Sequence, residues 1–312
     1  MSFVDIVRTI LTDGFLCSLI ALGVFLTFRL LDFADMTAEG SILIGGAVCA
    51  LMLKKDLPPI VATFGGMLGG AGCGLITGFL NRILKVPKLL SGIITLTASA
   101  SLAIVILSLA NGVWPTTLIK IGDKSTIFSF LDPAIFKGWQ RVIVFGIVAL
   151  VVMFITYFFF GTEYGMAIRA TGINEKMAKS QGINTTATTI ICVAISNAII
   201  GLAGALLLQR KTSGFDTTSA TGYLIVGLAS ILIGEAVFGK RSFKNCLISI
   251  SLGSVLYFTI FSITSEVFHV QPELDKLIYA ILIVIALCLP MIKEGIRKLF
   301  TRNKEVDNNA RT

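Results

Sequence analysis

Charged side chains are scarce in this chain. They make up 14% of its 312 residues, while 55% are hydrophobic and the mean hydropathy is +0.88. Soluble domains carry about 25% charged residues, so the composition excludes an ordinary soluble protein and predicts an integral membrane protein. The polar segment 1–13 and the lack of a small-residue cleavage site before a soluble domain predict that no signal peptide is removed.

Three site signatures are also missing. No G-x-x-x-x-G-K-[ST] phosphate-binding loop occurs, so any ATP that drives this protein has to bind another chain. The single histidine, His269, makes a metal centre or a histidine-based catalytic pair unexpected. No C-x-x-C pair exists, and the six cysteines are predicted to be small core residues of apolar runs: Cys17, Cys49, Cys73, Cys192, Cys246 and Cys288.

Long hydrophobic runs dominate the chain. They predict an all-α integral membrane protein with about 8–9 transmembrane helices, because a spanning helix needs about 20 largely apolar residues. We expect one transmembrane domain over 1–292 and a charged tail over 293–312. The runs lie at about 15–31, 42–53, 60–80, 89–110, 142–160, 186–208, 223–238, 246–263 and 277–291. The third run carries a four-residue ladder of glycines that predicts close helix packing within the chain: Gly66, Gly70, Gly74 and Gly78.

A polar break separates the first two runs. It is rich in carboxylates and hydroxyls, namely Asp32, Asp35, Thr37, Glu39 and Ser41. Unwound backbone at membrane depth is tolerated only where protein or a water-filled cavity covers it. The sequence therefore predicts a broken helix after the first span.

A polar island at 163–184 interrupts the apolar pattern a second time. A charge at the middle of a bilayer costs about 2.5–3.5 kcal/mol even on the lenient scale, so this segment is expected in water or at the interface. We predict a short helix over 164–171 that ends at Gly172 with a positive φ. Asn174 is expected to cap a second helix, and Gly182 to close it.

The pattern G-x-A-x-R-A-x-G-x-N-x-x-x-A-x-x-x-G-I, which begins at Gly165, resembles the coupling loop of ATP-binding-cassette importer permeases. The closest branch includes the branched-chain amino-acid and ribose permeases. The resemblance implies that loop 162–185 docks in a cleft of a cytoplasmic ATPase subunit, which uses ATP and Mg²⁺. Glycines would shape the turn, alanines would permit close docking, and an arginine would offer a charge to the partner. The residues in these roles are Gly165, Arg169, Ala170, Gly172, Asn174, Ala178 and Gly182.

The segment LLDFADMTAEGSILIGG at 30–46 resembles a permease subfamily associated with tryptophan, tyrosine and related small polar solutes. In that subfamily a D-F-x-D-x-T-x-[DE]-G-S motif follows the first span, near the path between two protomers. The resemblance implies that the solute path includes Asp32, Asp35, Thr37, Glu39 and Ser41. It also implies an aromatic amino acid as solute, a second permease copy in a homodimer, and an extracytoplasmic substrate-binding lipoprotein. The chain itself would perform no covalent chemistry and bind no cofactor.

The basic residues predict the orientation. With nine segments and the N-terminus outside, 16 of the 26 lysines and arginines fall on the inner side, which the positive-inside rule favours. This places the coupling loop and the C-terminal tail in the cytoplasm of a bacterial cell whose plasma membrane holds the chain. The net charge of +8 is then explained by orientation in the lipid bilayer, and no nucleic-acid partner is expected.

Two other functions fit parts of the sequence. In an ion-coupled secondary transporter, Asp35 or Glu235 would relay protons or ions, although Glu235 could instead pair with Lys240 or Arg241. In a membrane-embedded, Mg²⁺-dependent prenyltransferase-like enzyme, carboxylates at positions 32, 35 and 39 would share one helix face and bind a metal diphosphate. That enzyme class needs a second acidic cluster on the same side, and the sequence does not supply one.

Overall fold

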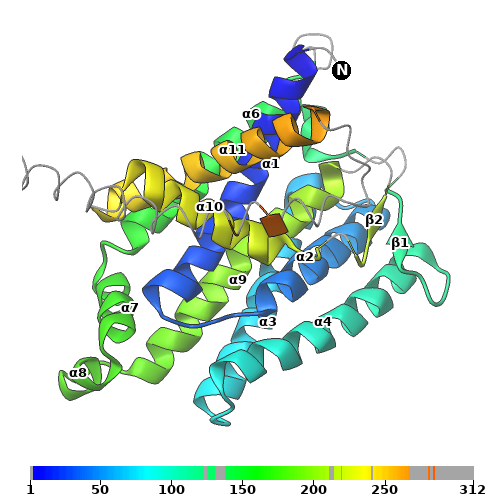
Figure 1. Cartoon of the computed structure of the whole chain (residues 1–312). Helices are drawn as coiled ribbons and strands as arrows, with labels where there is room; N and C mark the ends of the chain where they lie inside the picture. Colours follow the sequence, from blue (N-terminus) through cyan, green and yellow to red (C-terminus); the bar gives the residue numbers. More distant parts are fainter. Residues whose placement is uncertain are drawn as a thin grey trace, which may run out of the picture.

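The computed structural model describes residues 3–121, 125–130, 138–210, 214–218, 220–239 and 242–267, together with residues 280, 281 and 284. This part of the chain is almost entirely helical, as predicted (Figure 1). The helices are α1 (Phe3–Phe25), a π-helix η1 (Leu26–Leu30), α2 (Thr37–Lys54), α3 (Pro59–Arg82), α4 (Lys88–Asn111), a 3-10 helix η2 (Ile127–Phe130), α6 (Gln140–Phe159), α7 (Glu163–Ile173), α8 (Glu175–Ser180), α9 (Thr185–Arg210), α10 (Tyr223–Phe238) and α11 (Phe243–Val267). Two short strands, β1 (Leu118–Ile119) and β2 (Phe215–Asp216), pair antiparallel.

Seven of the described helical segments are long and apolar enough to cross a bilayer: α1 with η1, α2, α3, α4, α6, α9 and α11. α10 has only 16 residues and is about 24 Å long, less than the ~30 Å hydrocarbon core. The predicted run at 277–291 lies outside the described residues apart from positions 280, 281 and 284. The most buried spans are α1, α2 and α9, whereas α3, α4 and α6 expose apolar side chains.

The first helix is longer than its apolar run. The predicted apolar run at about 15–31 lies within α1 and η1 apart from its last residue, and the helix itself begins earlier, at Phe3. Ion pairs stabilise its polar first turns. Arg8 Nη1 lies 3.1 Å from Asp5 Oδ1, and Asp13 forms an ion pair with Arg210 of α9. α1 and η1 together are about 40 Å long, so one end extends past the bilayer core. Figure 1 shows the N-terminal end of α1 standing clear of the other helices.

The glycine ladder of α3 packs within the chain, as predicted. A Cβ atom on Gly70 would lie 2.3 Å from the carbonyl oxygen of Asn197 in α9, and one on Gly66 would lie 2.5 Å from that of Gly45 in α2. Any larger side chain at these positions would push the backbones apart. The central contact of α2, α3 and α9 therefore depends on small residues, as is usual where helices pack in lipid.

The predicted break after the first span lies at residues 31–36, between η1 and α2. Asp32 has a φ of 50°, a region that non-glycine residues seldom occupy. The amide of Phe33 donates to the carbonyl of Thr27 at 3.0 Å, and the Phe33 ring is fully buried. The break is therefore a packed connection between two membrane helices.

The molecule has two distinct ends. α7 and α8 project at one end, where α1 finishes and α4 begins, and the β1–β2 sheet lies toward the other (Figure 1). In the sheet, Leu118 pairs with Asp216 and Ile119 with Phe215.

Five of the six cysteines belong to the described residues, and all five are buried and free, which confirms their prediction as core residues.

Candidate functional site

The first element of the predicted coupling loop is α7. Thr162 caps its N-terminus, because its hydroxyl accepts a hydrogen bond from the amide of Gly165 at 3.3 Å. Gly165 also allows the helix to pass close to the end of α6, since a Cβ there would lie 2.4 Å from the carbonyl oxygen of Phe159. The glycine is thus required by a close approach between the coupling loop and a membrane helix.

The predicted role of Gly172 is wrong in its mechanism. α7 does not end there with a positive φ; it continues to Ile173, and Gly172 lies within the helix. A Cβ atom at this position would lie 1.6 Å from the carbonyl oxygen of Leu30 in η1. The residue is small because α7 contacts the end of the first membrane helix, a contact that local sequence chemistry does not reveal.

The two capping predictions for α8 are confirmed. The Asn174 side chain accepts a hydrogen bond from the amide of Met177 at 3.0 Å. At the other end Gly182 has a φ of 82°, and the amides of Gly182 and Ile183 donate to the carbonyls of Lys179 and Ala178, each at 3.1 Å. This pair of bonds is the Schellman arrangement that closes a helix.

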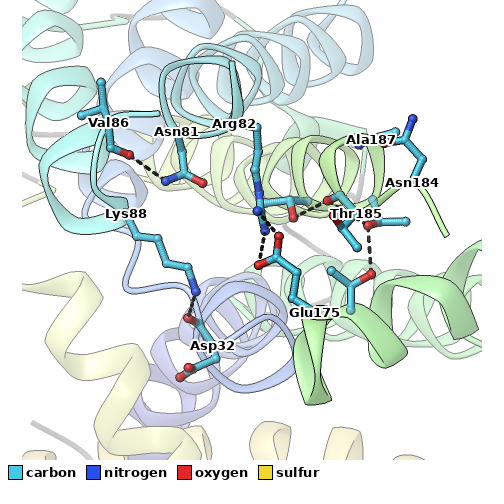
Figure 2. Close-up of polar contacts among 12 residues, drawn as sticks. Asp32, Asn81, Arg82, Val86, Lys88, Glu175, Asn184, Thr185 and Ala187 are labelled. Carbon is cyan, nitrogen blue, oxygen red and sulfur yellow. Dashed lines mark hydrogen bonds and ion pairs between the residues drawn. The ribbon is translucent and has the colours of Figure 1, made fainter. Parts of the chain in front are cut away.

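α8 is tied to the membrane helices by an ion pair. Arg82, the last residue of α3, reaches Glu175 with its Nη1 2.5 Å from Oε1 and its Nη2 3.3 Å from Oε2 (Figure 2). This hydrogen bond from Arg82 holds the pKa of Glu175 below its usual range. Figure 2 also shows Lys88, at the start of α4, donating to the backbone carbonyl of Asp32 in the break at 2.9 Å.

Arg169 connects α7 to α11. Its guanidinium carbon lies 5.1 Å from the centre of the Phe243 ring, a cation–π contact. Arg29 of η1 lies close by and binds Glu235 of α10 through two hydrogen bonds of 3.1 and 3.2 Å. Arg29, Arg169 and Glu235 border one cavity of about 340 Å³. Glu235 is thus an ion-pair residue, and Arg29 is a partner that the sequence had not suggested.

Apolar side chains are exposed on α7 and α8, at the end of the molecule where the chain leaves the membrane helices. Ile173 is 87% exposed, Tyr164 70% and Met177 62%. Ala170 is half-buried, whereas Ala178 is buried and packs within the chain. The predicted coupling residues therefore shape and anchor the loop, and the freely accessible apolar surface comes from residues that the motif did not single out.

Three of the five predicted path residues form a buried polar cluster. Asp35 accepts the amide of Thr37 at 2.8 Å and the side-chain amide of Asn197 in α9 at 2.7 Å. The Ser41 hydroxyl donates to the side-chain oxygen of Asn197 at 2.7 Å. The Thr37 hydroxyl lies 2.6 Å from that of Thr77 in α3. All of these side chains are at most 6% exposed.

The other two predicted path residues lie outside this cluster. Asp32 is exposed, and Glu39, in the first turn of α2, is half-buried. One carboxylate oxygen of Glu39 accepts the amide of Gly222 at 2.9 Å, where α10 begins.

Asn197, which bonds to the predicted path residues Asp35 and Ser41, was not itself predicted from the sequence. An amide in the middle of a long apolar run is costly unless it is hydrogen-bonded, and that signal was present in the 186–208 run.

The prediction of an Mg²⁺-dependent enzyme is contradicted, because Asp32 lies in a non-helical segment and Asp35 is occupied by internal hydrogen bonds. No cluster of three or more His, Cys, Asp or Glu side chains that could hold a metal occurs among the residues described.

Comparison with known proteins gives one consistent result. The profile of the family described as "Branched-chain amino acid transport system / permease component" matches residues 6–287. The chain is 34% identical to the tyrosine transport system permease protein of Clostridioides difficile over 93% of each chain. It is 29% identical to the probable branched-chain amino acid transport permease protein LivH of Methanocaldococcus jannaschii, over 74% of this chain and 72% of that one. It is 24% identical to the L-arabinose transport system permease protein AraH of Escherichia coli, over 90% of this chain and 80% of that one. No solved structure matches the chain significantly.

Proposed function

We propose that this chain, which belongs to the family of permease components of branched-chain amino acid transport systems, carries an aromatic amino acid into the cell. The chain is a multi-pass membrane protein and the permease subunit of an ATP-binding-cassette importer; it is not itself an enzyme. What supports an aromatic solute is the similarity, over nearly the whole length, to a relative named for tyrosine transport.

The proposed docking surface for the ATPase is the exposed end of α7 and α8. Ile173 and Met177 present apolar area next to Lys176 and Lys179, which are exposed on α8. Exposed apolar side chains of this size are common at protein interfaces. Motion of the ATPase would reach the membrane helices through three contacts of the loop: Gly172 on η1, Arg169 on α11, and Glu175 on α3.

For the solute path we propose Glu39 as the residue that faces the amino group of the solute. Its carboxylate is half-buried at the junction of α2 and α10, whereas Asp32 in the break is exposed and Asp35 is buried. The buried cluster of Asp35, Thr37 and Ser41 would hold the break in shape behind it. Two copies of the chain in a homodimer would enclose the path, with Asp32 near its cytoplasmic mouth.

The proposed orientation places α7 and α8 in the cytoplasm and the N-terminus outside. The basic ends of α3 and α4, at Arg82, Lys85 and Lys88, lie at the same end as the coupling loop, in keeping with the positive-inside rule. The β1–β2 sheet then lies on the outer side, where a substrate-binding lipoprotein would deliver the solute.

A pull-down tests this function. The tagged chain would be purified from detergent-solubilised native membranes, and the co-purifying proteins identified by mass spectrometry. We expect an ATPase with a phosphate-binding loop and a substrate-binding lipoprotein, whose ligand would then be found by a thermal-shift screen of amino acids. An aliphatic amino acid or a sugar as ligand would disprove the aromatic solute. A chain that purifies alone and moves solute down an ion gradient in liposomes would disprove the ATP-driven mechanism.

A further inference from the structure

A cationic cavity lies between α6, α7 and α11. It has a volume of about 490 Å³. Its polar lining residues are Arg169, Lys244, Thr162, Ser242 and Tyr157, and the rest are mainly phenylalanines. In the part of the chain that the structure describes, neither Arg169 nor Lys244 forms an ion pair with a carboxylate. The cavity thus presents two positive charges, and none of its lining residues is acidic.

An apolar groove adjoins this cavity. It has a volume of about 250 Å³ and lies between the last turns of α6 and the first turns of α11. The cavity and the groove share two lining residues, Tyr157 and Lys244. The remaining lining of the groove is entirely apolar: Leu150, Met153, Phe154, Leu247 and Ile248.

The two spaces meet where the membrane helices end. α6 finishes at Phe159 and α11 begins at Phe243, so the cavity lies at the level of the last membrane turns and the groove extends along the spans. Leu150 and Phe154 are 61% and 63% exposed, as side chains that face lipid are. A cationic cavity next to an apolar groove is complementary to the anionic headgroup and the acyl chain of a phospholipid.

We infer that this cavity and groove bind one anionic phospholipid of the leaflet on the α7–α8 side. The phosphate would accept hydrogen bonds from Lys244 and from the Arg169 guanidinium, whose carbon lies 5.1 Å from the centre of the Phe243 ring. An acyl chain would fill the groove. Basic pockets between helices on the cytoplasmic side are a known form of lipid recognition. A zwitterionic lipid fits less well, because its ammonium group would lie close to two fixed cations.

Charge also argues against the chain's own tail as the occupant. Segment 293–312 carries six lysines and arginines against three acidic residues. Such a segment would be repelled by Arg169 and Lys244, whereas an anionic lipid would be attracted.

The lipid would also bridge α7 and α11, the two helices that the Arg169–Phe243 contact joins, and so would stiffen the link between the coupling loop and the membrane domain. The inference rests on the proposed function in one respect: the proposed orientation identifies this leaflet as the cytoplasmic one.

Native mass spectrometry of the full-length chain in detergent tests the binding directly. Phosphatidylglycerol and phosphatidylcholine of equal chain length would each be titrated. We expect one phosphatidylglycerol to bind with higher affinity than phosphatidylcholine. Lys244→Gln should weaken phosphatidylglycerol binding about fivefold, the change that corresponds to ~1 kcal/mol per basic residue near an anionic surface. Lys85→Gln, which removes one exposed charge at the same end of the molecule, should leave binding unchanged.

A second variant tests the groove. Ile248→Trp should fill the space between α6 and α11 and reduce phosphatidylglycerol binding while the cations remain. Leu68→Trp on the exposed face of α3 is its control, because Leu68 is 66% exposed and lies elsewhere. Equal affinity for the two lipids, or unchanged binding in both Lys244→Gln and Ile248→Trp, would overturn the inference. Displacement of the lipid by water-soluble glycerol phosphate would assign the cavity to a soluble anion instead. Since no transport is measured, these results are independent of the proposed solute.

Discussion

Arg82 at the end of α3 and Glu175 at the start of α8 are joined by two hydrogen bonds, although 93 residues separate them in sequence. The pair links the second short helix of the coupling loop to a membrane span whose glycines pack on α9. In the proposed coupling mechanism, this contact would pass a displacement of α8 to the centre of the helix bundle. The Glu175 side chain is 43% exposed and that of Arg82 15%, so solvent screens the pair in part and its effect on the free energy of unfolding is expected to be small.

Removal of this ion pair should affect transport more than folding. Glu175→Gln leaves the N-cap of α8 on Asn174 intact but removes the charge that Arg82 binds. We expect a several-fold loss of ATP-driven uptake in proteoliposomes with an unchanged melting temperature. The double variant Arg82→Glu with Glu175→Arg should restore part of the uptake. A double variant no better than either single charge reversal would contradict a direct role for the pair.

The pH dependence of the same pair follows from the sign of its pKa shift. The pKa of Glu175 is lowered in the folded protein, so the stabilisation is present above the ordinary glutamate value of about 4.3 and is lost as the pH falls through the lower folded pKa. The contact should persist throughout the neutral range. Proteolysis of the loop, measured relative to an unfolded reference peptide at pH 5 and 7, should therefore give the same relative rate for the wild type at both values, whereas Arg82→Gln should raise the relative rate at both.

Two glycines of the coupling loop should respond differently to substitution. A Cβ atom at Gly172 would lie 1.6 Å from the carbonyl of Leu30, so Gly172→Ala must separate α7 from η1. Gly182 has open space around it and needs only its positive φ, so Gly182→Ala should cost about 1–2 kcal/mol of local strain. Thermal unfolding in detergent should show a large drop in melting temperature for Gly172→Ala and a small one for Gly182→Ala. Equal drops would contradict the close approach.

These glycines also show what sequence reasoning could reach. Local chemistry predicts a cap at Asn174 and a left-handed glycine at Gly182, because both depend on neighbours within a few residues. Gly172 looks the same in sequence, yet its role depends on Leu30 of η1, which is 142 residues away along the chain. The distant partners of Arg169 and Glu235 escaped prediction for the same reason: nothing near them in the sequence indicates Phe243 or Arg29.

The broken helix is a similar case. The polar residues at 32–41 predict an interruption, and the structure has one. Which of them face inward depends on α3 and α9, whose side chains at Thr77 and Asn197 complete the cluster around Asp35. A pattern within one segment identifies the break, but it cannot assign partners that arrive from two other helices.

The buried cluster should be important for stability. Asn197→Leu removes the side-chain amide that Asp35 accepts and the oxygen that receives the Ser41 hydroxyl. Leaving buried polar groups unsatisfied costs about 1–3 kcal/mol for each group. We expect a clearly lower melting temperature in detergent and less protein in the membrane. Thr97→Leu on α4 is a matched control, because Thr97 is exposed and bonds only within its own helix; an equal loss there would contradict a special role for the cluster.

Arg169 should be essential for coupling. Arg169→Glu loses the cation–π contact with Phe243 and places a negative charge in the cavity that also holds Glu235. We expect no measurable transport, with membrane insertion intact as judged by protease protection of the loops. Arg169→Lys should retain part of the activity, since an ammonium can also lie over an aromatic ring. Normal transport by Arg169→Glu would remove Arg169 from the coupling pathway.

Glu39 offers the sharpest test of the solute path. Glu39→Gln keeps a carbonyl oxygen that can accept the amide of Gly222, so the junction of α2 and α10 should stay folded. The variant lacks the charge that would pair with the amino group of an amino acid. Uptake of tyrosine or phenylalanine should therefore require at least tenfold more solute for half-maximal rate, with an unchanged melting temperature. Glu163→Gln removes an exposed charge on α7 and should leave the half-maximal concentration as it is. An unchanged half-maximal concentration in Glu39→Gln would mean that the solute passes elsewhere, and the buried cluster behind Glu39 would then be purely structural.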